Sequence, residues 1–330
     1  MNRTNELSSS AKTLTPATPR FSVAGCLYAL LIAMRPRQWT KNLAVFVGIV
    51  FAQQLLKPVL FGRATLAFGA FCLAASGLYL LNDLLDLEHD RQHPKKKYRP
   101  LAAGSLPVSW AIVAIGFLWL ACAGLTTILY FIPITGMDTF ARLGGTNLLF
   151  TYTLVFYVVL MILYSVRLKH VVLLDVFTIA SGFALRILAG AVVIPVIISP
   201  WLYIVTIMLS LLLALGKRRN ELVLLEKDAS NHRQILKEYT LPLLDQLITI
   251  VTTATVMSYS LYTFQASTGG DRLMITIPLV LYGMFRYLYL VYVRKEGGSP
   301  EEVLLRDPHM LGTVVLCIVV VIAVLYILPH

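Results

Sequence analysis

The chain has 330 residues, of which 58% are hydrophobic and only 14% are charged, and its formal net charge is +11. With a mean hydropathy of +0.75, this composition excludes a soluble globular domain and indicates a membrane protein with several spans. Basic loops next to anionic lipid head groups account for the positive charge, so we expect no nucleic-acid partner. The four cysteines all fall in apolar stretches and imply no disulfide framework.

Residues 1–20 are rich in Ser, Thr, Pro and Asn and lack an apolar run, which predicts a disordered cytoplasmic tail. The remainder, 21–330, is expected to form one transmembrane domain. Its first apolar stretch, 21–34, is interpreted as an interfacial helix rather than a span. Beyond it we expect an all-α bundle of about nine membrane-spanning helices, at residues 42–58, 65–86, 107–131, 148–166, 171–194, 199–216, 242–265, 273–294 and 309–328.

Most of the 28 Lys and Arg residues lie in the tail and in the loops after the second, fourth, sixth and eighth expected spans. Cytoplasmic loops of membrane proteins are enriched in these residues, so the pattern predicts a cytoplasmic N-terminus and an odd number of spans. We therefore expect a multi-pass protein of the cell (plasma) membrane, with the loop after the second span on the cytoplasmic side.

The segment that leads into the first expected span carries Arg35, Arg37, Trp39 and Lys41. One interpretation is an interfacial anchor, with the indole at head-group depth and the basic residues on lipid phosphates. The other is that Arg35 and Lys41 help to hold a phosphorylated substrate at the cytoplasmic mouth. The segment alone favours neither interpretation.

The second expected span ends in an acidic stretch that contains Asn82, Asp83, Asp86 and Asp90. Residues three and four apart share a face of a helix, so we expect the three carboxylates on one stripe. They repel one another unless a cation lies among them, and oxygen ligands without His or Cys suit Mg²⁺. The alternative is a solvated helix end, but carboxylates at a membrane edge are costly and tend to mark function.

A basic run that includes Lys95, Lys97 and Arg99 follows directly. Carboxylates next to cations suit a polyphosphate, because Mg²⁺ bridges its oxygens while Lys and Arg neutralise the remaining charge. The two stretches together predict a diphosphate-bearing substrate at the cytoplasmic edge.

Two later stretches add further charge. Asp175 and Arg186 lie about three helical turns apart in one expected span, so they share a face. Arg186 is interpreted as facing a water-filled phosphate cavity, with a helix-packing role as the alternative. The charged segment from Gly216 to Asp245, which includes Lys217, is expected either as an amphipathic cap over the cytoplasmic opening or as a solvated loop.

These stretches resemble the UbiA superfamily of intramembrane prenyltransferases, which share an Asn-Asp-x-x-Asp-x-x-x-Asp signature, here at residues 82–90. The stretches at 35–42, 82–104, 164–190, 216–221 and 282–287 are similar to its decaprenyl-phosphate phosphoribosyltransferase branch. The resemblance implies nine helices around a central cavity that opens to the cytoplasm. It also implies Mg²⁺-dependent transfer of a 5-phosphoribosyl group from 5-phosphoribosyl 1-diphosphate to a polyprenyl phosphate, for cell-envelope synthesis.

By this resemblance the metal ligands are Asp83, Asp86 and Asp90, and the catalytic residues are Asp83, Asp86, Tyr164 and Asp175. The substrate-binding residues are Arg35, Lys41, Asn82, Lys95, Lys97, Arg99, Lys169, Arg186 and Lys217. The lipid tail would lie between helices, and the chain could form a homo-oligomer.

Members that use a prenyl diphosphate are similar in carrying a second Asp-x-x-x-Asp, whereas here Asp175 is followed four residues later by Ile179. A weaker second metal site fits a donor other than a prenyl diphosphate. The alternative is transfer of a prenyl group from a prenyl diphosphate to an aromatic or glycerol-phosphate acceptor. A transporter is the third hypothesis, and it is disfavoured because the charges gather at one face and the sequence has no convincing repeat.

Overall fold

The computed structural model describes residues 22–134, 139–197, 199–225, 238–265, 270–295, 298, 303 and 306–327. Helices make up the regular structure of this part of the chain, and no strand occurs in it, which confirms the all-α prediction. The predicted tail, 1–20, and residues 226–237 of the predicted cap lie outside the described residues.

The described residues contain eight helices that are long and apolar enough to cross a membrane. Each corresponds to one of the expected spans, so the chain is a multi-pass integral membrane protein. They are α3 (Pro58–Leu85), α5 (Val108–Phe131), α6 (Thr146–Val166), α7 (Leu174–Val193), α8 (Pro200–Leu225), α9 (Leu241–Gln265), a segment from Arg272 to Arg294 that contains α10 (Ile277–Tyr289), and a segment from Pro308 to Ile327 that begins with α12 (Pro308–Ile322).

The first expected span, 42–58, is not a continuous α-helix. A 3₁₀-helix, η1 (Pro36–Phe46), leads into the five-residue helix α2 (Val47–Phe51), and the chain then turns before α3 begins. The count of nine α-helical spans is therefore not confirmed in the part of the chain that the structure describes. The 11-residue helix α1 (Val23–Ala33) is too short to cross the hydrocarbon, as the interfacial interpretation requires.

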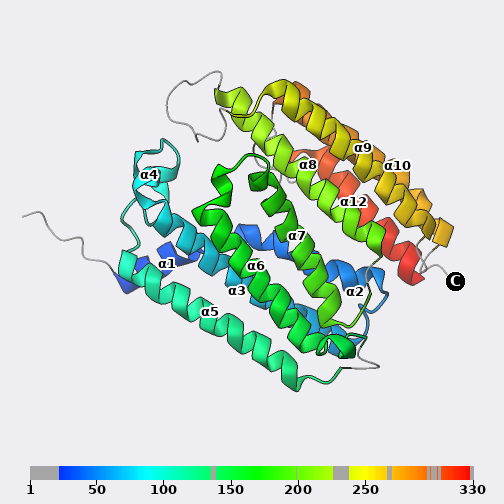
Figure 1. The fold of residues 1–330 in the computed structure, drawn as a ribbon, viewed down its shortest axis with the longest axis horizontal. Helices are drawn as coiled ribbons and strands as arrows, with labels where there is room; N and C mark the ends of the chain where they lie inside the picture. Colours follow the sequence, from blue (N-terminus) through cyan, green and yellow to red (C-terminus); the bar gives the residue numbers. More distant parts are fainter. Residues whose placement is uncertain are drawn as a thin grey trace, which may run out of the picture.

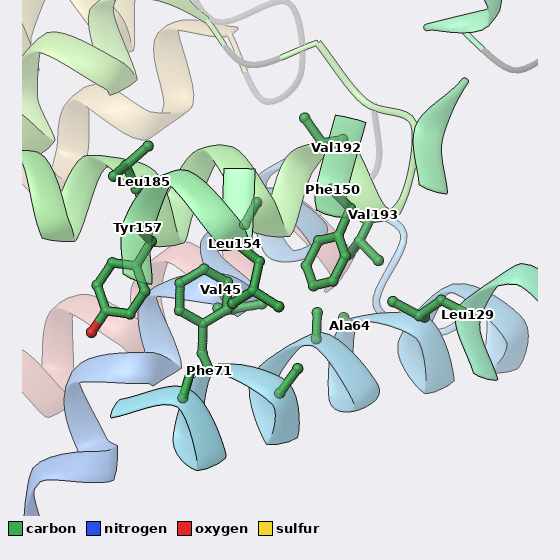
Figure 2. Close-up of a cluster of buried hydrophobic side chains, with 14 of the residues drawn as sticks. Val45, Ala64, Phe71, Leu129, Phe150, Leu154, Tyr157, Leu185, Val192 and Val193 are labelled. Atoms are coloured by element: carbon green, nitrogen blue, oxygen red, sulfur yellow. The ribbon is translucent and has the colours of Figure 1, made fainter. Parts of the chain in front are cut away.

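The helices form two groups that meet along α7 and α8 (Figure 1). In one group, α3 packs against α5, α6 and α7 through a core that includes Phe71, Phe150 and Tyr157 (Figure 2). In the other group, α8 packs against α9 and α10 around Leu212, Leu244 and their neighbours.

The segment η1 is fixed against two spans of the first group. Trp39 Nε1 donates to Ser76 Oγ on α3 at 3.1 Å. On the other side, a Cβ placed on Gly190 of α7 would lie 1.9 Å from the carbonyl oxygen of Val45, so only glycine permits this contact. The close approach of the two backbones holds η1 between α3 and α7.

The last turn of α3 leads directly into the site. The helix ends at Leu85, Asp86 is its C-cap, and the short helix α4 (Leu87–Gln92) follows. The loop then forms a 3₁₀ turn, η2 (Lys96–Tyr98), and returns over α3 by burying Leu101 and Leu106 against α1 and α5. This buried return positions the basic run beside the acidic stretch.

Candidate active site

The predicted acidic stripe does not lie on one continuous helix, because the helix breaks at Asp86, but the three aspartates stay close to that break. Asp86 leaves the helical conformation with φ −93° and ψ 7°. The N–H of Asp86 still donates to the carbonyl of Asn82 at 3.0 Å, and the N–H of Asp90 donates to that of Asp86 at 2.8 Å. The side chains of Asp83 and Asp90 are both 2% exposed, and that of Asp86 is half-buried. The three carboxylates therefore lie around one break between α3 and α4.

Two arginines from distant parts of the chain hold Asp83. Arg35 Nη2 lies 2.6 Å from Asp83 Oδ1, and Arg99 Nη1 lies 3.1 Å from the same oxygen. The same nitrogen of Arg99 also donates to Asp90 Oδ2, and Lys96 Nζ lies 3.7 Å from Asp90 Oδ1. One guanidinium nitrogen thus lies between two carboxylates, which shows that Asp83 and Asp90 can share a cation.

Asp86 has a different partner. Lys169, in the 3₁₀ turn η4 (Leu168–His170) between α6 and α7, places its Nζ 2.6 Å from Asp86 Oδ1. Asn82 Nδ2 donates to the other oxygen of Asp86 at 3.2 Å. The Lys169 side chain is only 6% exposed, so its end of this ion pair is shielded from water, whereas Asp86 is half-buried. It ties the α6–α7 turn to the end of α3.

The donor set at this break fits Mg²⁺. Its oxygens come from Asn82 and the three aspartates, and the shared nitrogen of Arg99 marks a position where two carboxylates accept one cation. In the described residues, no group of three or more His, Cys, Asp or Glu side chains is close enough to form a metal cage. Mg²⁺ commonly uses one or two carboxylates and completes its shell with water and substrate phosphates.

A cavity of about 320 Å³ adjoins this cluster. Part of its lining is apolar and comes from the end of α1, and another part carries cations and a carboxylate. The lining residues are Ile32, Ala33, Arg35, Asp83, Lys95, Tyr98, Arg99 and Pro100. The cavity can therefore accept a group that has a phosphate next to an apolar portion.

Two basic residues predicted to bind substrate in the stretches at 35–41 and 95–99 do not line this cavity. Lys97 is exposed, and its Nζ lies 5.2 Å from the centre of the Tyr98 ring. Lys41 is half-buried in η1. Of the basic residues predicted to bind substrate, Arg35, Lys95 and Arg99 line the cavity.

Asp175 lies in a second, closed cluster. Its side chain is 0% exposed, Arg218 Nε donates to its Oδ2 at 2.6 Å, and the Tyr239 hydroxyl donates to its Oδ1 at 2.7 Å. Burial and the hydrogen bond to Asp175 raise the pKa of Tyr239, which keeps the phenol protonated as a donor. Tyr164, at the end of α6, interacts electrostatically with Arg218.

The sequence analysis missed Arg218 and Tyr239 and chose Lys217 instead, which is exposed. The reason is that we ended the sixth span at residue 216, although α8 continues as one helix to Leu225. Arg218 therefore lies on a helix face that packs into the protein, not in a loop. The helix propensity of residues 217–225 was the signal that could have revealed this.

Arg186 is buried among neutral groups. Its Nε donates to Asn42 Oδ1 at 2.7 Å, its Nη1 to the carbonyl of Gly182 at 2.8 Å, and its Nη2 to the Tyr157 hydroxyl at 2.7 Å. The guanidinium also lies 4.7 Å from the centre of the Tyr157 ring, whose hydroxyl end is visible in Figure 2. Among the described residues, Arg186 forms no ion pair with a carboxylate, and its partners are a side-chain amide, a backbone carbonyl and a phenol.

The fold and these clusters define a polytopic helical membrane protein with a carboxylate and cation site suited to phosphate chemistry. Comparison with known proteins identifies the family. The chain belongs to the UbiA prenyltransferase family, whose sequence profile matches residues 42–306.

Two relatives of named activity match most of the chain. It is 32% identical to a decaprenyl-phosphate phosphoribosyltransferase of Corynebacterium glutamicum, over 91% of this chain and 87% of that protein. It is also 32% identical to the protein of the same name from Mycolicibacterium smegmatis, over 89% of this chain and 90% of the relative.

Solved structures support the fold. A UbiA homolog from Archaeoglobus fulgidus bound to GPP and Mg²⁺ aligns with a TM-score of 0.66 at 16% identity, covering 91% of this chain and 100% of that one. A digeranylgeranylglyceryl phosphate synthase aligns with a TM-score of 0.61 at 17% identity, covering 92% of this chain and 99% of the other. The UbiA fold predicted from the sequence is confirmed.

Proposed function

We propose that this chain transfers a 5-phosphoribosyl group from 5-phosphoribosyl 1-diphosphate to a polyprenyl phosphate and releases diphosphate. The observation that carries the proposal is the 32% identity, over 91% of the chain, to a decaprenyl-phosphate phosphoribosyltransferase. The cluster at the end of α3 supports it, because carboxylates and cations together suit a donor that carries a diphosphate.

The reaction suits what these side chains can do. The acceptor phosphate is already an anion, so its oxygen can attack C1 of the ribose without a strong general base. The main demands are to hold the two substrates in line and to neutralise the charge on the departing diphosphate. Arg35, Lys95 and Arg99, which line the cavity, are proposed to bind the donor phosphates.

Mg²⁺ is proposed as the cofactor, with its protein ligands drawn from Asp83, Asp86 and Asp90, one or two of which would bind it while water and substrate phosphates complete its shell, and with Asn82 orienting the group. Bound there, it would supply positive charge to the leaving diphosphate. The donor set at the break after α3 supports this assignment, and the Archaeoglobus fulgidus homolog is described as bound to Mg²⁺. Lys169, paired with Asp86, would keep that carboxylate in place.

Arg186 is proposed to bind the acceptor phosphate or the 5-phosphate of the donor. Its buried charge, which contacts only neutral protein groups among the described residues, supports this role. Lys41, in the neighbouring segment η1, would add a second cation. Tyr164 and Asp175 stay among the residues proposed to support the reaction, and both interact with Arg218. Lys97 and Lys217 stay among the residues proposed to bind substrate, as exposed cations of the cytoplasmic face.

The test incubates purified protein in detergent with radiolabelled 5-phosphoribosyl 1-diphosphate, a polyprenyl phosphate and Mg²⁺. We expect a labelled lipid that extracts into organic solvent and disappears when a chelator is added. The alternative function, prenyl transfer to an aromatic or glycerol-phosphate acceptor, is tested in parallel with a labelled prenyl diphosphate. A product only in the second reaction would refute the proposal.

Topology is part of the proposal. We infer that the N-terminus and the cluster face the cytoplasm, because Lys and Arg are concentrated in the loops on that side. Single cysteines introduced at exposed Lys97 and at exposed Arg142 would report on the two faces in intact cells. A membrane-impermeant thiol reagent should label only the second position, and the opposite pattern would invert the topology.

A further inference from the structure

Asp175 stands at the start of α7 with both carboxylate oxygens engaged by the protein itself. Arg218 and Tyr239 each take one oxygen, and these two side chains are only 2% and 3% exposed. Arg218 also donates to Glu221 on the same helix. Asp175 is 0% exposed, so its carboxylate is shielded from water. This environment contrasts with that of Asp86, which is half-buried beside its lysine.

The Tyr239 hydroxyl makes a second contact that extends the cluster. It accepts a hydrogen bond from the N–H of Leu173 at 2.8 Å while donating to Asp175. Leu173 has φ 65° and ψ −41°, a conformation that non-glycine residues rarely adopt. One phenol thus holds both an unusual turn and the carboxylate that follows it.

The turn at Leu173 comes shortly after Lys169, the residue that contacts Asp86. Lys169 lies a few residues before Leu173, in η4, and its Nζ is 2.6 Å from Asp86 Oδ1. The direction in which the chain leaves Leu173 sets where η4 can lie. A change at Tyr239 therefore reaches Asp86 through the backbone of residues 169–173.

We propose that Asp175 is a positioning residue, which acts through Arg218 and Tyr239 on the turn that presents Lys169 to Asp86, and that it does not ligate a second metal ion. Arg218 supplies, from the chain itself, the positive charge that a second cation would bring. The inference rests on one part of the proposed function, namely that the chain binds diphosphate together with a divalent cation. It holds equally for a phosphoribosyl or a prenyl donor.

The first test measures metal binding without turnover. Mn²⁺ binding to the purified protein in the presence of inorganic diphosphate is followed by electron paramagnetic resonance. Asp175→Asn keeps an amide oxygen that can accept from Tyr239, so we expect it to bind as many Mn²⁺ ions as the wild type with affinity within about twofold, whereas Asp83→Asn weakens binding about tenfold or more. Loss of an Mn²⁺ ion in folded Asp175→Asn protein would overturn the proposal.

The second test asks whether Tyr239 acts through Lys169. Removing the hydroxyl in Tyr239→Phe should weaken binding of inorganic diphosphate with Mg²⁺ about tenfold, measured by calorimetry. In a Lys169→Met background, the same change should have an effect of less than about twofold, because the interaction it supports is already gone. Equal effects of Tyr239→Phe in both backgrounds would refute the coupling.

Tyr326→Phe is the matched control. Like Tyr239, the Tyr326 hydroxyl accepts from a backbone N–H, that of Leu55 at 3.4 Å, but it donates to a backbone carbonyl, that of Val50 at 3.0 Å, and not to a carboxylate. It lies between α2 and the end of the last span, away from both charge clusters. We expect this variant to lose stability without a change in diphosphate affinity, so a loss of affinity here would attribute the Tyr239 effect to general destabilisation.

Discussion

The two ends of α3 carry charge for opposite purposes. Near its start, Arg63 is 0% exposed and donates to the main-chain carbonyls of Leu129, Ile132 and Val193, at 3.0, 2.9 and 2.8 Å, and also to Asn147. At the other end, Asp83, Asp86 and Asp90 are paired with long cationic side chains from the residue before η1, the loop after α4 and the α6–α7 turn.

The two ends differ in whether a ligand could replace the partners of the charged residues. Three of the four acceptors of Arg63 are backbone carbonyls at the ends of α5 and α7, where a cation is favourable to the helix dipole. The partners of the aspartates are flexible side chains. Two of them are partly exposed, Arg35 at 29% and Arg99 at 26%. Such side chains can exchange a carboxylate for a phosphate, so the first end serves folding and the second serves chemistry.

The largest expected effect is on activity, at the second end. Asp86→Ala should lower Mg²⁺-dependent turnover about a thousandfold, because it removes a proposed metal ligand and the partner of Lys169. The protein should still elute as a folded monodisperse species in detergent. Glu88→Ala is the control, since that side chain is 74% exposed on α4, and it should keep near-normal rates. Near-normal rates in Asp86→Ala would remove this end from the chemistry.

The next effect is on stability, at the first end. Arg63→Met leaves three carbonyls, two of them in buried hydrogen bonds, and Asn147 without this donor, and it should lower the free energy of unfolding by about 3 kcal/mol or more. Thermal unfolding in detergent measures this change. The exposed Arg142→Met should be neutral. An Arg63 variant of unchanged stability but lost activity would reverse the roles assigned to the two ends.

Arg186 sharpens the comparison because it is buried like Arg63 but bonds mainly to side chains. Arg186→Lys keeps the charge and loses the planar fork that reaches Asn42 and Tyr157 together. We expect a loss of about 1–2 kcal/mol of stability and about a tenfold rise in the KM of the phosphate-bearing substrate. A purely structural arginine would lose the stability and leave KM as it was.

The smallest effect is expected at an ion pair outside both ends. Arg286 donates to Asp307 at 2.6 Å, and this hydrogen bond lowers the pKa of Asp307. A carboxyl whose pKa is lower in the folded state adds stability above its unfolded pKa of about 3.9, and that stability disappears as the pH falls through the lower folded value.

Asp307→Asn tests this contribution and keeps an N-cap for α12, which Asp307 provides through the N–H of Met310. We expect a loss of about 0.5 kcal/mol at neutral pH that vanishes in strong acid. Unfolding curves of the variant and the wild type at several pH values measure it. A difference that grows as the pH falls would contradict the assignment.

Hydropathy predicted the spanning helices because each is a long apolar run, but it could not specify what happens at their ends. The stretch 42–58 met the hydropathy criterion, yet it contains Gly48, Gln53 and Gln54 and forms a 3₁₀-helix, a short α-helix and a turn. The sixth span was ended too early because hydropathy falls at Lys217 while the helix continues.

The acidic and basic residues of the site could be predicted from local spacing, whereas their partners could not. Arg218, Tyr239 and Asn42 become part of the clusters only because the fold brings α8, the start of α9 and η1 against α7. No spacing rule connects residues that are 43 or 144 positions apart. Such contacts depend on tertiary packing, and a single sequence does not encode them in a readable pattern.

The winding of η1 has a geometric consequence. With three residues per turn, Trp39, Asn42 and Val45 stand in one vertical column, whereas an α-helix would rotate each of them about 60° from the last. Val45 and Asn42 are 0% and 1% exposed, and Trp39 bonds to Ser76, so the whole column is turned inward. If this segment were an α-helix, the amide of Asn42 would turn away from Arg186. The 3₁₀ winding therefore allows the hydrogen bond between Arg186 and Asn42.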